Sequence, residues 1–224
     1  MRSAAITVIC VVLLVGVVLV FWSVSAQTRP SLNELLTKAE AGGAEVQFNL
    51  GNMYRKGEGV PKNAVEAVKW FTRAAEQGDA PAQFNLGFMY ANGKGVPKNA
   101  VEAVKWYTRA AEQGLALAQC FLGIMYAKGE VVPKDAVEAV KWYTRAAEQG
   151  FAWAQSNLGD MYYQGIGIPK DFVLAYKWSN LAAASGTDSG VALRDLVEKQ
   201  MTSDQIAEAQ RLSAAFVPKP EVKP

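Results

Sequence analysis

Apolar residues recur along this chain with a short period of three to four residues and a long period of 36. Ala67, Trp70 and Ala74 follow the short period, which places them on one face of a helix. The long period repeats this pattern in four successive units. Identical residues recur at intervals of 36 at Gln47, Gln83, Gln119 and Gln155, at Gly51, Gly87, Gly123 and Gly159, at Tyr54, Tyr90, Tyr126 and Tyr162, and at Trp70, Trp106, Trp142 and Trp178. Such a period is typical of a solenoid, in which each unit buries its apolar face against its neighbours.

The second half of each unit predicts one helix. Asn63 is a favourable N-cap residue, and Glu66 three positions later predicts a capping box, in which each side chain bonds to the backbone N–H of the other residue. Gly78 supplies the left-handed residue that ends such a helix. The same pair recurs as Asn99 with Glu102 and as Asp135 with Glu138, whereas Asp171 with Leu174 keeps only the cap. A helix is therefore expected to begin at the same position of every unit.

The first half of each unit predicts the antiparallel partner of that helix. In the second unit it begins at Asp79, tolerates Pro81 in its first turn and ends at Gly93. Gly87 lies on the apolar face, where the missing side chain allows the partner helix to approach closely. Glycine and proline in residues 57–61 predict the tight connection between the two helices of the first unit. Each unit is therefore expected to form a helical hairpin.

We therefore predict an all-α protein, a right-handed α-solenoid of antiparallel helix pairs with four 36-residue repeats and capping helices. The repeats span residues 43–78, 79–114, 115–150 and 151–186, with an N-terminal capping helix in residues 27–42 and C-terminal capping helices in residues 187–216. Thr202 with Gln205 predicts a capping box at the start of the last helix. Residues 217–224 are rich in proline and charge, a composition that predicts a disordered tail.

The first 26 residues have the pattern of a targeting segment. Arg2 precedes an uncharged stretch in residues 4–22, and Val24 and Ala26 offer the small residues of a signal-peptidase site. At ~1.5 Å per residue this stretch would also reach about 28 Å as a helix, enough for an uncleaved membrane anchor. We expect cleavage after Ala26 and a periplasmic or secreted protein, with an inner-membrane anchor facing the periplasm as the alternative. The repeats are exported in both cases.

Composition excludes several classes of function. A net charge of +2 and the absence of Lys/Arg runs argue against nucleic-acid binding. The chain contains no histidine, which excludes conventional Ser-His or Cys-His catalysis and removes the commonest zinc ligand. Cys10 lies in the targeting segment, so Cys120 is the single thiol of the remaining chain and forms no intramolecular disulfide. We expect no cofactor, no metal and no catalysis, and membrane contact only through an uncleaved N-terminal segment.

The repeated motif resembles a known family. Each unit carries a variant of Gly-x-Met-Tyr-x-x-Gly-x-Gly-Val, followed by Ala-x-x-Trp-Tyr-x-x-Ala-Ala-x-x-Gly. This string resembles the Sel-one-like repeat, a relative of the tetratricopeptide repeat, and the resemblance covers residues 31–216. Residues 201–209 are also similar to the closing segment common in bacterial members. The resemblance implies an α-solenoid that serves as an adaptor or scaffold for protein or peptide partners and that is often exported in bacteria.

The chain departs from the family pattern at two points. Val131 stands where the other units have Gly59, Gly95 and Gly167, so this loop is strained or rearranged if the position requires a positive φ. The chain also lacks the paired cysteines of the cysteine-rich secreted branch, some members of which bind or hydrolyse β-lactams. An enzyme of that type is the alternative function, and the missing cysteines weaken it.

The units differ from one another mainly in their first helices. Residues 61–78 and 97–114 differ only at Phe71 against Tyr107, whereas the first helices differ at many positions. The tetratricopeptide arrangement places first helices on the concave surface, so the resemblance implies a partner-binding face there. The expected binding residues are Phe48, Asn52, Arg55, Phe84, Phe88, Ile124, Trp153, Asp160 and Tyr163. Exposed aromatic residues of this kind are typical interface hot spots.

Some of the recurring residues have structural alternatives. Phe84 and Phe121 could equally pack between neighbouring first helices. Three asparagines recur on these helices and could hold an extended peptide backbone or bond to loop carbonyls, of which we favour the second. They are Asn49, Asn85 and Asn157. The repeated tryptophans lie on the helix face opposite the charges and are interpreted as core residues rather than as a ligand cage. The charged face of the second helices is interpreted as solvated, with weak ion pairs.

Overall fold

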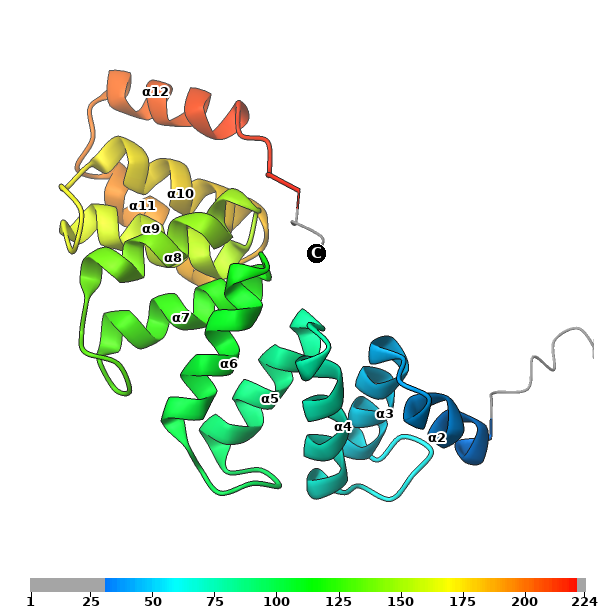
Figure 1. Cartoon of the computed structure of the whole chain (residues 1–224). Helices are drawn as coiled ribbons and strands as arrows, with labels where there is room; N and C mark the ends of the chain where they lie inside the picture. The colour runs from blue at the N-terminus through cyan, green and yellow to red at the C-terminus, as the bar shows by residue number, and fades with distance from the viewer. Residues whose placement is uncertain (1–30, 221–224) are drawn as a thin grey trace, which may run out of the picture.

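The computed structural model describes residues 31–220, which form eleven helices and no strand. The helices are α2 (Leu32–Glu40), α3 (Ala44–Lys56), α4 (Ala64–Glu76), α5 (Ala80–Asn92), α6 (Ala100–Glu112), α7 (Ala116–Lys128), α8 (Ala136–Glu148), α9 (Ala152–Gln164), α10 (Phe172–Ala184), α11 (Asp188–Glu198) and α12 (Ser203–Ala214). They follow one another along a single curved array (Figure 1). The predicted all-α solenoid of helix pairs is confirmed. The predicted targeting segment, residues 1–26, lies outside the described residues.

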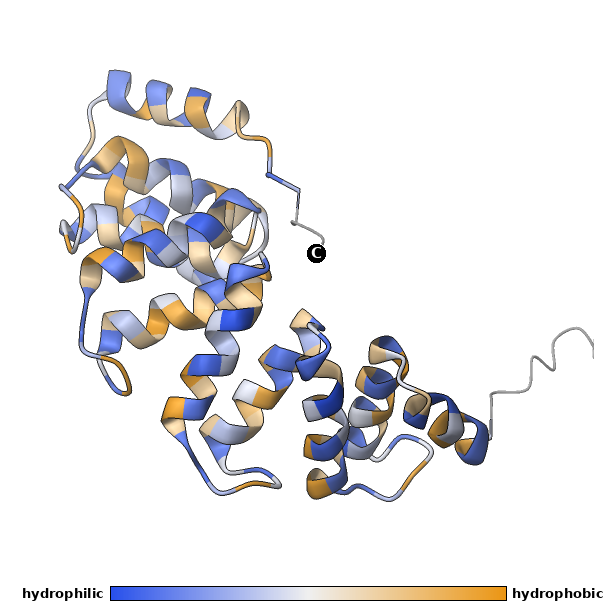
Figure 2. Cartoon of the chain, viewed as in Figure 1, coloured by the Kyte–Doolittle hydropathy of each residue, from blue (hydrophilic) through white to orange (hydrophobic). Residues whose placement is uncertain are grey.

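The four units are the helix pairs α3–α4, α5–α6, α7–α8 and α9–α10, and each second helix also packs on the first helix of the next unit. One apolar cluster shows the consequence of this arrangement. Phe71 of α4, Leu86 of α5 and Trp106 of α6 are buried together. Polar and apolar residues are interspersed along these helices (Figure 2), as expected where each helix buries one stripe. The core therefore continues through the junctions between units.

The glycine in the middle of the first helix allows the two helices of a unit to approach closely, as predicted. A Cβ atom added at Gly87 would lie 2.9 Å from Tyr107 Cδ1 and 3.1 Å from the Ala103 carbonyl oxygen. Both atoms belong to α6, the partner helix. Any side chain at this position would push the two helices apart.

The predicted cap of the second helices is confirmed, but the predicted capping box is wrong. Asn63 Oδ1 accepts hydrogen bonds from the backbone N–H groups of Val65 and Glu66, at 3.0 and 3.2 Å. The Asn63 N–H, however, donates to the Tyr54 carbonyl at 2.9 Å and needs no side-chain partner. Glu66 instead pairs with Lys69 at 3.3 Å. The hairpin connection therefore supplies the bond that an isolated capping box would make.

Helices that follow a hairpin connection are capped differently from α12, which follows no such connection. The backbone bonds Asn99 to Tyr90, Asp135 to Tyr126 and Asp171 to Tyr162 repeat the arrangement in the later units. At α12 no such connection exists, and the predicted capping box of Thr202 with Gln205 is confirmed. Thr202 N–H donates to Gln205 Oε1 at 2.9 Å, and Gln205 N–H donates to Thr202 Oγ1 at 3.3 Å.

The four repeated tryptophans are buried, which confirms that they belong to the core. Their position relative to the charges differs from the prediction. The Arg73 guanidinium lies 4.8 Å from the centre of the Trp70 ring, and the same pairing occurs between Arg109 and Trp106 at 4.7 Å. Residues three apart on a helix are neighbours, so the arginine covers the outer side of the indole. The charged face and the tryptophan face therefore meet rather than oppose each other.

The connection in the third unit is rearranged at Val131. Within residues 31–220 only glycines have a positive φ, including Gly59, Gly95 and Gly167 at +75°, +74° and +70°. Val131 therefore adopts a negative φ. In the other connections the residue after the C-cap glycine donates its N–H to the methionine carbonyl five residues earlier, as Lys94 does to Met89 at 3.0 Å. The equivalent bond from Glu130 is missing among the described residues, so the loop departs from the repeat rather than storing strain.

A ladder of buried glutamines joins the units. Gln83 Nε2 of α5 donates to the Ala75 carbonyl of the preceding unit at 3.0 Å, and Gln83 Oε1 accepts from Gln113 Nε2 at 2.7 Å. Each glutamine thus joins the ends of two successive second helices. The equivalent donor pairs in the first and third units are Gln77 to Gln47 at 2.6 Å and Gln149 to Gln119 at 2.8 Å. The repeated glutamine is a structural residue.

The ladder is incomplete in the fourth unit, which allows a test of its contribution. Gln155 Oε1 is buried and has no hydrogen-bond partner among the described residues, because Ser185 stands where the earlier units have glutamine. Ser185→Gln is expected to supply the missing donor and to raise the free energy of unfolding by about 1 kcal/mol. Urea titration measures this change. Ser185→Ala is the control, and equal stability of the two variants would contradict the ladder's role.

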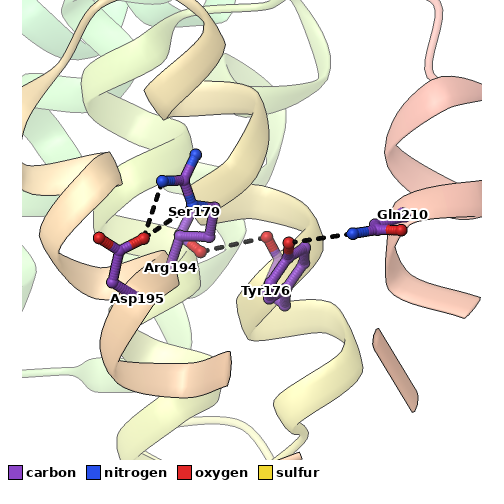
Figure 3. Close-up of polar contacts among 5 residues, drawn as sticks. All are labelled: Tyr176, Ser179, Arg194, Asp195 and Gln210. Carbon is purple, nitrogen blue, oxygen red and sulfur yellow. Dashed lines mark hydrogen bonds and ion pairs between the residues drawn. The ribbon is translucent and has the colours of Figure 1, made fainter. Parts of the chain in front are cut away.

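Helices α10, α11 and α12 close the C-terminal end of the array. Tyr176 of α10 is buried, and its hydroxyl accepts a hydrogen bond from Gln210 Nε2 of α12 at 3.5 Å (Figure 3). Beside it, Ser179 Oγ donates to the Tyr176 carbonyl at 3.1 Å, and Arg194 of α11 pairs with its neighbour Asp195 (Figure 3). The Gln210 bond attaches α12 to the last repeat, and α11 packs on α10 through Val197, which is buried in one cluster with Tyr176.

The described part of the predicted disordered tail is held against the repeats. The Lys219 N–H donates to the Glu148 carbonyl at 2.8 Å, and Lys219 Nζ lies 2.7 Å from Glu148 Oε2. The Phe216 ring, just before the tail, lies 5.6 Å from the Trp178 ring. Residues 217–220 therefore lie along the end of α8, next to the contact between Phe216 and Trp178. Residues 221–224 lie outside the described part.

Candidate protein-binding site

The aromatic residues of the first helices pack on one another and on the second helices. Phe84 of α5 lies 5.3 Å from the Tyr107 ring of α6 and 5.2 Å from the Phe121 ring of α7, measured between ring centres. Phe48 of α3 lies 6.1 Å from the Phe71 ring of α4. Phe48, Phe84 and Phe121 are half-buried by these contacts. Part of each ring therefore stabilises the solenoid, and only the remainder is available to a partner.

Phe88 and Ile124 occupy the next turn of the first helices and are also half-buried. Phe88 packs against the cluster around Tyr107, and Lys94 Nζ lies 5.1 Å from the centre of its ring. Ile124 packs against the neighbouring cluster that contains Cys120. Both side chains lie on the surface formed by the first helices, but part of each is buried in the core.

Three further predicted residues already have polar partners. Arg55 Nη2 donates to Asn52 Oδ1 at 3.0 Å, so these two predicted binding residues bond to each other on α3. The Tyr163 hydroxyl of α9 accepts from Gln200 Nε2 at 2.8 Å, and its ring lies 5.9 Å from that of Phe172. Tyr163 therefore helps to attach the turn after α11 to the last repeat.

Trp153 differs from the other aromatic candidates because 59% of its surface is exposed. It lies in the first turn of α9, with its ring 6.3 Å from that of Phe151. Every other tryptophan of the described part is buried. An indole costs free energy when it remains in water, so an exposed one marks a candidate contact surface.

A pocket of about 420 Å³ opens beside Trp153, between α9 and α11. Its lining residues are Trp153, Ser156, Asn157 and Asp160 of α9 and Ser189 and Leu193 of α11. The four residues of α9 follow the spacing of one helical stripe. Ser156 Oγ and Ser189 Oγ are 2.9 Å apart and join the two helices. The structure thus brings the predicted residues Trp153 and Asp160 to one concave site, whereas the other predicted residues lie on the preceding first helices or, like Tyr163, at the end of α9.

Two of the three recurring asparagines bond within their own helices. Asn85 Nδ2 donates to the Pro81 carbonyl at 3.0 Å, and Asn157 Nδ2 donates to the Trp153 carbonyl at 2.8 Å. The preferred interpretation, bonding to loop carbonyls, is wrong for these two residues, because the acceptors are helix carbonyls four residues earlier. One N–H donor of each of these two amides is therefore already used, which weakens the alternative of a ladder that holds a peptide backbone.

The ionisable groups of the core are unsuited to nucleophilic chemistry. Cys120 is fully buried, and burial raises the pKa of its thiol to about 12. Burial likewise raises the pKa of the Tyr107 and Tyr143 hydroxyls. Because the thiolate is the reactive form of cysteine, Cys120 stays protonated and inert at neutral pH. On the outer face, exposed pairs such as Glu66 with Lys69 are the weak surface ion pairs that the sequence predicts.

Two features of the surface were not predicted. A row of exposed valines repeats near the start of the second helices, at Val65, Val101 and Val137. These valines recur every 36 residues in the sequence, but helical spacing alone does not show which positions remain exposed to solvent. The link between Ser156 and Ser189 is the second feature, and no sequence pattern indicates it because α11 departs from the repeat.

Comparison with known proteins defines the family. The Sel1 repeat matches residues 44–79, 80–115, 116–151 and 154–187, which is more than half of the chain. The protein belongs to the Sel1 repeat family, the family of Sel-one-like repeats that its motif resembles. Members of this family are generally scaffolds for protein interactions. A comparison with curated protein sequences finds no significant match.

Several solved structures are similar to this chain, and the following two are examples. A Sel1 repeat protein from Oxalobacter formigenes shares 38% sequence identity with a TM-score of 0.68, over 73% of this chain and 47% of that one. The protein c5321, a protective antigen of uropathogenic Escherichia coli with an SLR fold, shares 31% identity with a TM-score of 0.53, over 84% of this chain and 48% of that one. This chain thus spans about half the length of each.

No helix within residues 31–220 combines the length and the apolar character needed to cross a membrane.

Proposed function

We propose that this protein is a non-catalytic scaffold that binds a protein or peptide on the face formed by its first helices. The observation that carries this proposal is the exposed Trp153 beside the pocket between α9 and α11. The second helices of the first three units, α4, α6 and α8, are nearly identical, whereas the first helices of these units differ at many positions. In the fourth unit the second helix, α10, differs as well. Variation on the first helices above constant second helices is typical of a binding surface on a scaffold.

We further propose that the scaffold acts in the cell envelope or outside the cell. The uncharged stretch after Arg2 and the small residues before Gln27 support cleavage of a signal peptide. Mass measurement of the protein isolated from its native cell is expected to show Gln27 as the first residue. Recovery of the full-length chain in the membrane fraction would support the anchored form instead.

Capture of a partner by residues 27–224 tests the binding face directly, because this segment contains every described helix. Trp153→Ala and Phe88→Ala are each expected to weaken binding by about 1–2 kcal/mol, the effect of truncating an aromatic hot spot. Calorimetry measures the affinity of each variant for the captured protein. Thermal melts of the same samples exclude unfolding, which matters most for the half-buried Phe88.

The matched control is on the second helix. Glu102 and Lys105 form an exposed pair at 3.3 Å, and exchanging them by Glu102→Lys with Lys105→Glu reverses the local charge while keeping the pair. This double variant is expected to bind normally. Loss of affinity in the double variant, with normal binding by Trp153→Ala and Phe88→Ala, would place the binding face on the second helices and refute the proposal.

A further inference from the structure

The pocket between α9 and α11 combines two side chains that no other unit combines. Trp153 and Asp160 lie seven residues apart on α9, at the two ends of the pocket lining. The residues that correspond to Trp153 in the earlier units are Glu45, Pro81 and Leu117, and those that correspond to Asp160 are Asn52, Phe88 and Ile124. An exposed indole together with a carboxylate therefore distinguishes the fourth unit.

Asp160 is the single charged residue of the pocket lining. Its Oδ2 atom accepts a hydrogen bond from Gln164 Nε2 at 2.6 Å, and no ion pair between described residues includes it. A carboxylate without a cation at the end of a concave surface produces a local negative potential. The complementary group on a ligand is a lysine or arginine side chain.

The opposite end of the pocket is apolar and the middle is neutral. The exposed indole of Trp153 lines one end, and Ser156, whose hydroxyl is paired with that of Ser189, lies between Trp153 and Asp160 along α9. Residues seven apart on a helix are separated by about 10.5 Å along its axis. An extended chain advances by about 3.3–3.6 Å per residue, so roughly three residues of a ligand span this distance.

We propose that the pocket receives an extended segment of a partner protein in which a lysine or arginine lies about three residues from an apolar side chain. The cation pairs with Asp160, and the apolar side chain packs on Trp153. This inference rests on the proposed function, to which it adds the chemistry of the ligand.

Short peptides test the proposal without knowledge of the natural partner. The probes are the acetylated and amidated tetrapeptides Leu-Gly-Ser-Arg and Arg-Gly-Ser-Leu, which cover both chain directions, and the same two with glutamine in place of arginine. NMR titration of residues 27–224 follows the indole N–H signal of Trp153, which Trp153→Phe assigns. At least one arginine peptide is expected to shift this signal and to bind about fivefold more tightly than its glutamine counterpart, as a partly exposed ion pair would allow.

Variants of the carboxylate supply the decisive comparison. Asp160→Asn is expected to abolish the preference for arginine while the protein stays folded, because asparagine occupies the corresponding position, Asn52, in the first unit. Asp195→Asn, an exposed carboxylate of α11 outside the pocket lining, is expected to keep the preference.

Three results would each overturn the proposal: equal affinity for arginine and glutamine peptides, a preference that survives Asp160→Asn, or no shift of the Trp153 signal with any of the four peptides. The scaffold function is judged separately. If the peptides fail while Trp153→Ala and Phe88→Ala still weaken capture of the partner, only the ligand chemistry is wrong. If those variants capture the partner normally, the proposed binding face fails as well.

Discussion

Trp106→Ala is expected to lower the free energy of unfolding by about 3–5 kcal/mol, the usual cost of removing a large aromatic side chain from a core. Trp106 is 7% exposed and belongs to a cluster with Phe71 and Leu86, which come from the preceding unit and from its own. The cavity would thus open at a junction between repeats, where two units depend on the same contacts. The variant would also remove the surface on which Arg109 lies at 4.7 Å. Urea titration measures the loss.

Two substitutions calibrate this result. Trp153→Ala removes the same side chain from a position that is 59% exposed and is expected to change stability by less than about 1 kcal/mol. Asn99→Ala removes a cap whose Oδ1 accepts from the Glu102 N–H at 3.1 Å and is expected to cost about 1 kcal/mol. Equal and mild effects of all three substitutions would contradict the assignment of Trp106 to the core.

Gly95→Ala is expected to destabilise the chain by about 2–5 kcal/mol for two separate reasons. Gly95 has a φ of +74°, which a residue with a Cβ atom adopts only at a cost of about 1–2 kcal/mol. A Cβ atom there would also lie 2.2 Å from the Ala64 carbonyl oxygen, at the start of the second helix of the preceding unit. The backbone of one of the two units would have to move, at a cost of about 1–3 kcal/mol.

Gly59→Ala separates the cost of the positive φ from the cost of the close approach between units. Urea titration measures the free energy of unfolding of both variants. Gly59 has a similar φ of +75°, but among the described residues the nearest atom to its added Cβ is Met53 Cε at 3.5 Å. The free energy of unfolding of Gly59→Ala is therefore expected to fall only by the conformational cost of about 1–2 kcal/mol. If both variants lose the same stability, the close approach between units at Gly95 makes no contribution of its own.

The fold is largely predictable from the sequence because the same local pattern occurs in four successive units. The spacing of Ala67, Trp70 and Ala74 and the cap at Asn63 predict a helix between Asn63 and Gly78, and the structure places it at Ala64–Glu76. Helical periodicity and N-caps involve residues within a few positions of one another, so the sequence contains the information they require. The closely approached Gly87 is predictable for the same reason, since its apolar neighbours repeat in every unit.

Local sequence patterns miss contacts in which a hydrogen-bond partner comes from a distant part of the chain. Tyr54 supplies the acceptor for the Asn63 N–H, which leaves Glu66 free to pair with Lys69. Lys219 of the tail contacts Glu148, 71 positions earlier in the chain. Neither contact has a signal in local composition or spacing.

The candidate site is likewise only partly predictable from the sequence. Comparison of the first three units identifies the first helices as the variable ones, and that comparison needs only the sequence. The exposure of each side chain needs the packing: Phe84 lies between two other rings, whereas Trp153 lies largely in water. The pocket itself needs α11, which departs from the repeat and meets α9 through Ser156 and Ser189.

By itself, the sequence determined the helices, their caps, the pairing within each unit and the face on which the units differ, because these depend on spacings that recur within 36 residues. The tertiary structure alone decided which backbone groups satisfy one another between segments, which aromatic rings remain exposed and where a concave site forms. Burial and hydrogen bonding between distant residues depend on how the helices meet, and no pattern along the chain specifies that geometry at the end of the array, where the repeat stops.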